Sequence, residues 1–315
     1  PTTTDSSGNY LVTGLEPGTY IVTVDTADLP AGISANTGDP DGGANAAAQL
    51  LLSPDEDRRD QDFGFRGVGR IGDRVWYDRD GDGVQASTGE PGVAGATLVL
   101  VWAGPDQILG NSDDRSFTTV TDSAGNYLFD GLPDGVFSVT QTTPIPGTSQ
   151  TFDPDSVRDG HSELTLSTGN RVNLDQDFGY RPSGSIGDRI WSDLDGDGIQ
   201  DSGEPGIVGI DVTLIWFGAD GVAGGGDDMT LTTTTNADGL YLFSNLPAGS
   251  YSITVTTPPT GFRQTGDPDS ARDLSSTVSL PAGGSNLADA LGINQLVSVH
   301  DFVSLHLNKD GIQDH

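Results

Sequence analysis

The sequence predicts an all-β protein built from tandem Greek-key β-sandwiches, on the strength of three observations. Glycine and proline account for 45 and 18 of the 315 residues, and threonine recurs in runs such as 232–235. This composition favours short strands and many turns. Apolar residues alternate with period two, as in Leu98, Leu100 and Trp102, which is typical of strands with one buried face. Several motifs return at a fixed interval, which indicates a repeat array.

The repeat is about 115 residues long. The stretch Ile71-Gly72-Asp73-Arg74-Val75-Trp76 returns at 186–191, and Asp62-Phe63-Gly64-Phe65 returns at 177–180. The four tryptophans form two equivalent pairs, and their strand-like alternation predicts a core role for Trp76 and Trp191.

The phase of the repeat predicts the domain boundaries. Residues 68–182 and 183–295 each form one complete unit, and residues 1–67 match only the later part of a unit. Residues 296–315 match the start of a further unit. A chain that begins and ends within a unit is most simply part of a longer array, although a subunit that completes its half-domains with neighbours would give the same pattern.

The repeat also decides an ambiguous segment. Residues 46–52, Ala-Ala-Ala-Gln-Leu-Leu-Leu, have helical propensity, but they align with Leu164-Thr165-Leu166 one unit later, so we predict a strand. About seven short strands per unit, separated by turns such as Leu132-Pro133-Asp134-Gly135, indicate a small Greek-key sandwich.

The charge balance limits the partners. With 46 acidic and 14 basic residues, the net charge of −32 repels nucleic acid and anionic membrane surfaces and favours cations. A solvated acidic coat is the alternative explanation. Cysteine is absent, so disulfides do not stabilise these units. The sequence has neither a stretch of about 20 apolar residues nor a signal peptide at its start, so we expect targeting or anchoring signals to lie outside it.

The most specific motif is a calcium loop in the second complete unit. Its spacing places oxygen ligands at positions one, three, five, nine and twelve, with glycine at six, as in an EF-hand loop. Alternate carboxylates in a tight turn point to one centre, and a backbone carbonyl at position seven supplies a further oxygen. A turn held open by water explains neither the spacing nor its recurrence. The predicted ligands are Asp193, Asp195, Asp197, the Ile199 carbonyl, Asp201 and Glu204.

The other copies of this loop are less regular. The first complete unit carries Asp78, Asp80, Asp82 and the Val84 carbonyl, but one inserted residue moves Glu90 to position thirteen. The incipient third copy has His306, Asn308 and Asp310 at the leading positions, and we expect it to bind calcium weakly. No helices are expected beside these loops.

Further acidic residues recur nearby. Two glycine-rich hairpins could each close around another ion, or be solvated tips; they contain Asp106, Asp113 and Asp114 in one unit and Asp220, Asp227 and Asp228 in the next. Asp73 and Asp188 lie next to the main loops in sequence and are candidate additional ligands. The motifs Asp153-Pro154-Asp155, Asp267-Pro268-Asp269 and Asp175-x-Asp177 favour turn and capping roles over ion binding.

Catalysis finds little support. The position equivalent to His161 holds Ala47 and Ser275 in the other copies. No paired carboxylates in an apolar pattern and no Ser/His/Asp arrangement can be argued. We therefore do not expect an enzyme.

Each unit resembles the B-type repeat of serine-aspartate repeat adhesins, the SdrD B-like family, related to the Cna B-type sandwich with its Ig-like or prealbumin-like topology. Three motifs carry the resemblance: Ile-Gly-Asp-Arg-Ile-Trp, Asp-Leu-Asp-Gly-Asp-Gly-Ile-Gln-Asp, and Asp-x-x-Gly-x-Tyr with its following Leu-Pro. The resemblance implies calcium-stiffened spacer domains in a linear array, with Asp193, Asp195, Asp197 and Glu204 as ligands. Related sandwiches use a Lys-to-Asn isopeptide bond, but the only lysine here is Lys309, so the complete units cannot form one.

Together these patterns predict a structural stalk or fibre on a bacterial surface or in a secreted filament. Its expected cofactor is Ca²⁺, and its expected partners are neighbouring repeats and other copies of itself. The alternative is an adhesin module that binds a glycan or a host protein through its loops, using tryptophan or tyrosine side chains.

Overall fold

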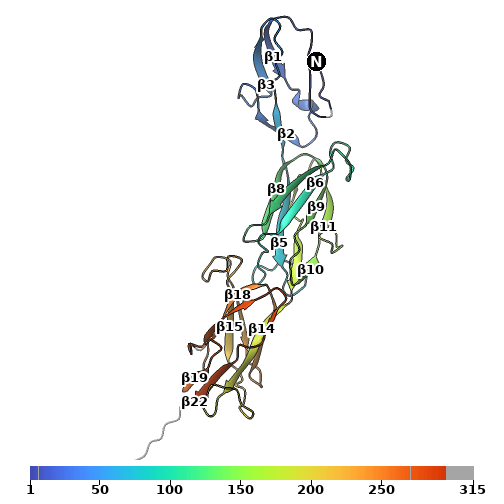
Figure 1. Ribbon diagram of the computed structural model, residues 1–315. Helices are drawn as coiled ribbons and strands as arrows, with labels where there is room; N and C mark the ends of the chain where they lie inside the picture. The colour runs from blue at the N-terminus through green and yellow to red at the C-terminus, as the bar shows by residue number, and fades with distance from the viewer. Residues whose placement is uncertain (6, 270, 296–315) are drawn as a thin grey trace, which may run out of the picture. The chain divides into compact units, whose positions relative to one another are not determined.

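The computed structural model describes residues 1–5, 7–269 and 271–295, and nearly all regular structure in these residues is β-strand (Figure 1). Their only helical element is the short 3-10 turn η1 (Thr26–Asp28). The all-β prediction is therefore confirmed. Within these ranges, no helix has the length and apolar character needed to cross a membrane. The predicted start of a further repeat at 296–315 lies outside the described residues.

The N-terminal segment forms two separate strand pairs. Strand β1 (Gly18–Thr23) pairs antiparallel with β3 (Ala47–Leu52), and β2 (Ile33–Gly38) pairs antiparallel with β4 (Gly64–Gly67). Strand β3 buries Ala48 and Leu50. The strand prediction for this helix-prone segment is thus confirmed: pairing with β1 and burial of alternate side chains outweigh local propensity.

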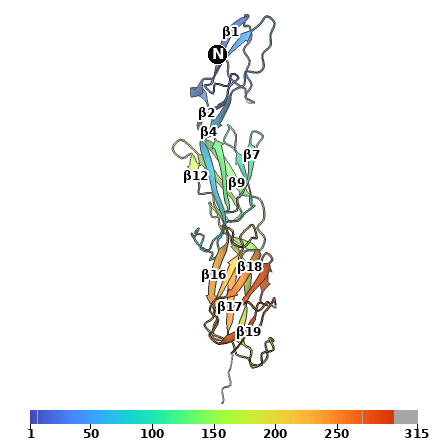
Figure 2. The ribbon, with the colours of Figure 1, turned by 90° about the vertical axis from the view of Figure 1, so that its left-hand side faces the viewer.

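The first sandwich consists of two sheets. One has the order β10 (Thr148–Phe152), β13 (Phe178–Pro182), β5 (Gly69–Tyr77) and β12 (Val172–Asn173), and β8 (Asn126–Leu132) also pairs with β5. The other has the order β11 (His161–Leu166), β9 (Gly135–Gln141), β6 (Thr97–Trp102) and β7 (Arg115–Val120). Strands β7, β9 and β12 can be followed in Figure 2.

The second sandwich repeats this topology. One sheet has the order β17 (Leu240–Leu246), β14 (Gly184–Ser192), β22 (Leu291–Gln295) and β19 (Phe262–Gly266), and β21 (Ser285–Asn286) also pairs with β14. The other has the order β16 (Met229–Thr234), β15 (Asp211–Trp216), β18 (Gly249–Val255) and β20 (Ser275–Leu280). Each sandwich thus has nine strands in the described residues, against the seven expected. The two-residue ladders β12 and β21 are too short for an alternating pattern to reveal.

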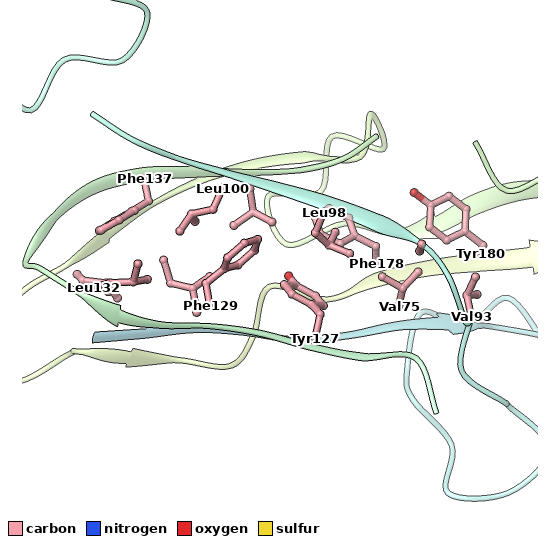
Figure 3. Close-up of a cluster of buried hydrophobic side chains, with 14 residues drawn as sticks. Val75, Val93, Leu98, Leu100, Tyr127, Phe129, Leu132, Phe137, Phe178 and Tyr180 are labelled. Atoms are coloured by element: carbon pink, nitrogen blue, oxygen red, sulfur yellow. The ribbon is translucent and has the colours of Figure 1, made fainter. Parts of the chain in front are cut away.

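The core lies between the two sheets of each sandwich. In the first sandwich, Leu100 and Phe137 of one sheet face Phe129 and Leu132 of the other (Figure 3). Leu98 and Leu100 are fully buried, as the alternation predicted. Burying each such side chain stabilises the fold by about 1.5–3 kcal/mol.

Two tryptophans connect the core to the loops that follow β5 and β14. Trp76 and Trp191 are 1% and 3% exposed, so their predicted core role is confirmed. The Trp191 indole is bordered by two glycines: a Cβ atom added at Gly292 would lie 2.7 Å from its Cζ2 atom, and one at Gly266 would lie 2.9 Å from its Cη2 atom. Only glycine leaves room for the ring at these positions.

Parallel pairing places a second strand beside the start of each of these loops. Residues Phe178–Tyr180 of β13 run parallel to Val75–Tyr77 of β5, and Leu291–Ile293 of β22 run parallel to Ile190–Ser192 of β14. In the second sandwich the Asp193 amide then donates to the Ile293 carbonyl at 3.0 Å. The loops therefore leave the sheet from a central strand and are held at their base.

A buried aspartate also lies in the first sandwich. Asp153 is 3% exposed, and its Oδ2 atom accepts hydrogen bonds from Gln150 Nε2 at 2.8 Å and from the Gly160 amide at 3.0 Å. These contacts make Asp153 a capping residue, as its Asp-Pro-Asp motif suggested. Burial raises its pKa to about 6.

We expect Asp153→Asn to change how stability depends on pH. The folded-state pKa lies above the ordinary value of 3.8, so the native state binds this proton more tightly and gains stability as pH falls from about 6 towards 4. Asparagine removes that gain, which is at most about 3 kcal/mol. Urea unfolding of the full chain from pH 7.5 to 4.5 measures the effect. An unchanged pH profile in the variant would contradict this role.

Candidate metal centres

The first candidate centre is the loop between β5 and β6. Asp78 follows β5 directly, is fully buried, and groups with Asp80 and Glu90 so that one carboxylate oxygen of each lies within 4.8 Å of the others. The backbone wraps around Asp78: its Oδ1 atom accepts from the Gly81 amide at 2.8 Å, and its Oδ2 atom accepts from the Gly83 amide at 2.9 Å. The loop is therefore folded around a carboxylate.

The second candidate centre is the equivalent loop between β14 and β15. Asp193 is fully buried and groups in the same way with the exposed Asp195 and Asp197. Its two oxygens accept from the amides of Gly196 at 2.6 Å and Gly198 at 2.8 Å. The two loops thus reproduce the same fold from the same spacing.

Glycine is needed at the sixth position of the loop for two reasons. Gly198 has a φ of 82°, a left-handed value that side chains rarely adopt. An added Cβ atom would also lie 2.8 Å from the Thr265 carbonyl oxygen. The sharp turn that brings alternate carboxylates together is therefore specific for glycine.

The glutamate that ends each loop is buried in both copies. Glu204 is 7% exposed and accepts from the Leu194 amide at 2.6 Å and the Asp201 amide at 3.0 Å. Glu90 is equally buried and accepts from the Ala86 amide at 2.8 Å. The carboxylate of Glu90 therefore reaches the cluster despite the inserted residue. The extra residue lengthens the turn before Glu90, and the carboxylate still accepts a hydrogen bond from an amide of the loop.

The electrostatics of the second loop show crowded negative charge. Burial disfavours the charged form of Asp193, but hydrogen bonds that include those from the Gly198 and Gly196 amides outweigh it and lower its pKa. At Asp195 the Asp197 amide lowers the pKa, yet desolvation and repulsion from the carboxylates of Asp197 and Asp193 leave it raised. A cation at this point would remove that repulsion.

The remaining predicted ligands of the loops lie at their surface. Asp82 and Asp197 each accept a hydrogen bond from the amide two residues on, Val84 and Ile199, at 2.7 Å. The residues Val84 and Ile199 are 63% and 64% exposed. His306, Asn308 and Asp310, the third copy, lie outside the described residues.

Asp73 and Asp188 stand apart from both clusters of the described residues. Asp177 Oδ1 accepts hydrogen bonds from the Asp73 amide at 3.3 Å and from the Arg74 amide at 2.9 Å. Burial, and then the Asp73 carboxyl, raise the pKa of Asp177. Burial likewise raises the pKa of Asp188. These residues belong to the sheet beside the loop. Asp177 accepts amides of the neighbouring strand β5 and not of its own turn, so the turn or capping role that its motif favoured is not what the structure shows.

The two acidic hairpins share an unusual feature. Asp114 Oδ2 accepts from the Gly110 amide at 2.7 Å, and Asp228 Oδ2 accepts from the Gly224 amide at 2.7 Å. The Oδ1 atom of each is buried without a hydrogen-bond partner in the described residues, as are Asp153 Oδ1 and Asp289 Oδ2 outside the hairpins. Buried carboxylate oxygens normally have a partner, so the two hairpin atoms are candidate ion ligands.

The other hairpin carboxylates accept local hydrogen bonds. Asp106 accepts from the Ile108 amide at 2.9 Å and from Asn111 Nδ2 at 2.7 Å, and Asp220 accepts from the Val222 amide at 2.8 Å. Asp227 accepts from the Ala219 amide at 2.7 Å, and Asp113 lies beside Gly104. The hairpins thus hold their acidic groups close to the turn.

The chemistry of both loops fits a hard divalent cation. Every candidate donor is an oxygen, and Ca²⁺ takes six to eight oxygen ligands in flexible geometry. One ion would contact carboxylates that the fold has already gathered and partly buried. Sequence reasoning missed three side chains that hydrogen-bond beside the loops. Gln85 donates to Asp177 Oδ2, Arg74 donates to Gln85 Oε1, and Arg189 donates to the Glu204 carbonyl. Their recurrence in the repeat was the signal that could have revealed them.

Comparison with known proteins identifies the repeat. The family model described as the SdrD B-like domain matches residues 69–180 and 184–287. The two matches fall within the two sandwiches, the second ending before β22, and they confirm the resemblance inferred from the repeated motifs.

Curated relatives extend this likeness to nearly the whole chain. Serine-aspartate repeat-containing protein F of Staphylococcus epidermidis is 33% identical over 99% of this chain and 18% of its own length. Serine-aspartate repeat-containing protein D of Staphylococcus aureus is 29% identical over 99% of this chain and 23% of its own length. The chain therefore spans about a fifth of the length of these relatives.

Among solved structures, the Bacillus anthracis TIE protein aligns with 88% of this chain and 52% of its own, at 13% identity and a TM-score of 0.36. The shaft pilin SpaA of Lactobacillus rhamnosus GG aligns with 74% of this chain and 98% of its own, at 11% identity and a TM-score of 0.30.

The glycines of the second loop provide a test of its backbone geometry. Gly196 and Gly198 have similar φ values of 80° and 82°, but a Cβ atom at Gly196 would meet only side-chain atoms, at 3.5 Å or more. We expect Gly196→Ala to cost about 1–2 kcal/mol of unfolding free energy from the left-handed backbone, and Gly198→Ala to cost more because it also meets the Thr265 carbonyl. Urea unfolding in chelator measures both. Equal losses of unfolding free energy would contradict the close contact at Gly198.

Proposed function

Because this chain belongs to the SdrD B-like domain family, we propose that it is a structural repeat region of an extracellular bacterial surface or filament-forming protein, a stalk or fibre stabilised by calcium. The observation that carries the proposal is the buried aspartate at the start of each loop, Asp78 and Asp193, with further carboxylates gathered around it. The relatives are named after a repeat and not after a reaction, which agrees with a structural role.

Each loop would hold one calcium ion. The proposed ligands are carboxylates and one backbone carbonyl of each loop. Asp78, Asp80 and Glu90 form one cluster and Asp193, Asp195 and Asp197 the other, whereas Asp82, Asp201 and Glu204 are included for their places in the same loops. The set omits Asp73 and Asp188, which lie in strands β5 and β14 and not in the loops. In the first loop the proposed ligands are Asp78, Asp80, Asp82, the Val84 carbonyl and Glu90. In the second they are Asp193, Asp195, Asp197, the Ile199 carbonyl, Asp201 and Glu204.

The acidic hairpins would hold further ions. The unpartnered buried oxygens of Asp114 and Asp228 support this step, because an ion would supply the partner that each oxygen lacks. Asp106 and Asp113 in one hairpin, and Asp220 and Asp227 in the other, would complete these sites.

Calcium would stabilise the sandwiches in two ways. It neutralises part of a net charge of −32, which lowers the repulsion that opposes a compact state. It also binds the folded loop in preference to the unfolded chain, so the free energy of unfolding rises with calcium concentration. With no cysteine, and with Lys309 as its only lysine, the chain has no disulfide or lysine-dependent crosslink within the complete units, and calcium would take that role.

The proposed setting is outside the cell. Modules of extracellular proteins bind calcium with dissociation constants of about 10⁻⁴–10⁻³ M, so loops of this kind fill only where free calcium is high. The proposed partners are calcium ions, neighbouring repeats and other copies of the chain in a fibre. The acidic surface opposes a nucleic-acid partner.

The second candidate function is an adhesin module that binds a glycan or protein through its loops. One observation weighs against it: Trp76, Trp191 and Trp216 are at most 3% exposed, so these large aromatic groups are not available to a ligand. A glycan array probed with the full chain tests this alternative. Specific binding that is lost on mutation of a loop aromatic would favour the adhesin.

We expect calcium to raise the melting temperature of the full chain. At millimolar calcium, a site with a dissociation constant of about 10⁻⁴–10⁻³ M is exposed to about one to ten times that concentration, which adds about 0.4–1.4 kcal/mol. For a domain of this size the expected rise is about 2–10 °C. The double variant Asp195→Ala/Asp197→Ala should lose the rise for the second sandwich. Thermal unfolding in millimolar calcium and then in excess chelator measures both effects.

The matched control removes two other exposed aspartates from the same sandwich. Asp269→Ala/Asp273→Ala deletes the same charge, and its carboxylates also accept backbone hydrogen bonds. This control should keep the full calcium response. The proposal fails if calcium leaves the melting temperature of the parent chain unchanged, or if both double variants respond alike.

A further inference from the structure

A glutamine ties the first loop to the sandwich. Gln85, at the eighth position of the loop, is half-buried, and its Nε2 atom donates to Asp177 Oδ2 at 2.9 Å. Asp177 precedes β13, which runs parallel to β5. Its other oxygen accepts from the Arg74 amide of β5 at 2.9 Å. The Asp177 carboxylate therefore joins the loop to the strand from which the loop departs.

The opposite end of the same amide group is also held. Arg74 Nη1 donates to Gln85 Oε1 at 3.4 Å, and Arg74 Nε donates to the Ala124 carbonyl at 3.3 Å. A carboxylate on one side and a guanidinium on the other leave only one orientation for the amide group. Gln85 therefore faces the sheet through both of its polar atoms and is not itself placed as an ion ligand.

The second loop has the same glutamine but not its partner. The pairing of β13 with β5 and of β22 with β14 places Ala290 at the position of Asp177, and alanine offers no side-chain acceptor. Gln200 is exposed. There the sheet holds the loop differently: Arg189 Nη2 donates to the Glu204 carbonyl at 3.1 Å.

We infer that Gln85 and Asp177 are positioning residues that hold the first loop in its cation-binding form, and that the second loop lacks this support. The inference rests on the proposed function, because it concerns how the same loops bind calcium. A loop already held closed loses less conformational freedom when the ion binds, so its affinity is higher. Losing one hydrogen bond to a carboxylate should weaken binding to the first loop about tenfold.

The test uses the full chain with one loop disabled at a time, and Tb³⁺ as the probe. Trp76 and Trp191 lie two residues before Asp78 and Asp193, so each can sensitise the luminescence of an ion in its own loop. Asp195→Ala/Asp197→Ala isolates the first loop, and Asp80→Ala/Asp82→Ala isolates the second. A chain that carries both pairs of changes supplies the background from all other sites.

Gln85→Ala should weaken Tb³⁺ binding to the first loop about tenfold, while the matched variant Gln200→Ala leaves the second loop within about twofold. Asp177→Ala should weaken the first loop similarly, and adding Gln85→Ala to it should have no further effect because both act through one contact. Melting in chelator shows whether each variant still folds.

Two results would overturn the inference. The first is a Tb³⁺ affinity of the first loop that stays within twofold after Gln85→Ala. The second is a double variant, Gln85→Ala with Asp177→Ala, whose loss of affinity equals the product of the two single losses. Either would show that the pair does not position the loop. Absence of Tb³⁺ binding to either loop of the parent chain would overturn the proposed calcium role together with this inference.

Discussion

The arrangement of each complete repeat depends on one fully buried carboxylate at the end of a central strand. Asp78 and Asp193 are 0% exposed, and a charge in that position is unfavourable unless other groups compensate it. Two backbone amides of the loop supply part of the compensation. Because glycine allows the chain to turn tightly enough to bring those amides in, the surrounding carboxylates are drawn to the same point. The loop thus creates a strongly negative centre whose natural complement is a cation.

The sandwich carries this centre at the end of a central strand. The loop leaves from β5 or β14, which pairs with strands on both sides, and the tryptophan two residues earlier packs in the core. Only two positions therefore separate a tryptophan packed in the core from the aspartate around which the loop closes, so closure of the loop and packing of the core affect each other. This coupling offers a physical route by which an ion bound at the surface stabilises the whole domain, in a chain that has no disulfides.

Much of this organisation could be predicted from the sequence, because the repeat imposes the same spacing twice. The alternation of Leu98 and Leu100 revealed the core face, and comparison of Ala46–Leu52 with its later copy identified a strand that local propensity would have missed. Contacts between distant positions could not be predicted. Gln85 meets Asp177 across 92 positions of sequence, and Asp73 turns out to belong to that neighbourhood. Glu90 reaches its cluster despite an inserted residue, because the turn before it lengthens.

The most direct test of this account counts the calcium ions that the full chain binds, by isothermal titration calorimetry with isosteric variants of the two buried aspartates. The account predicts saturable binding of at least two ions, with one ion lost in Asp78→Asn and a different one lost in Asp193→Asn. No saturable binding at millimolar calcium, or a stoichiometry that neither variant changes, would contradict the claim that the buried carboxylates organise calcium sites.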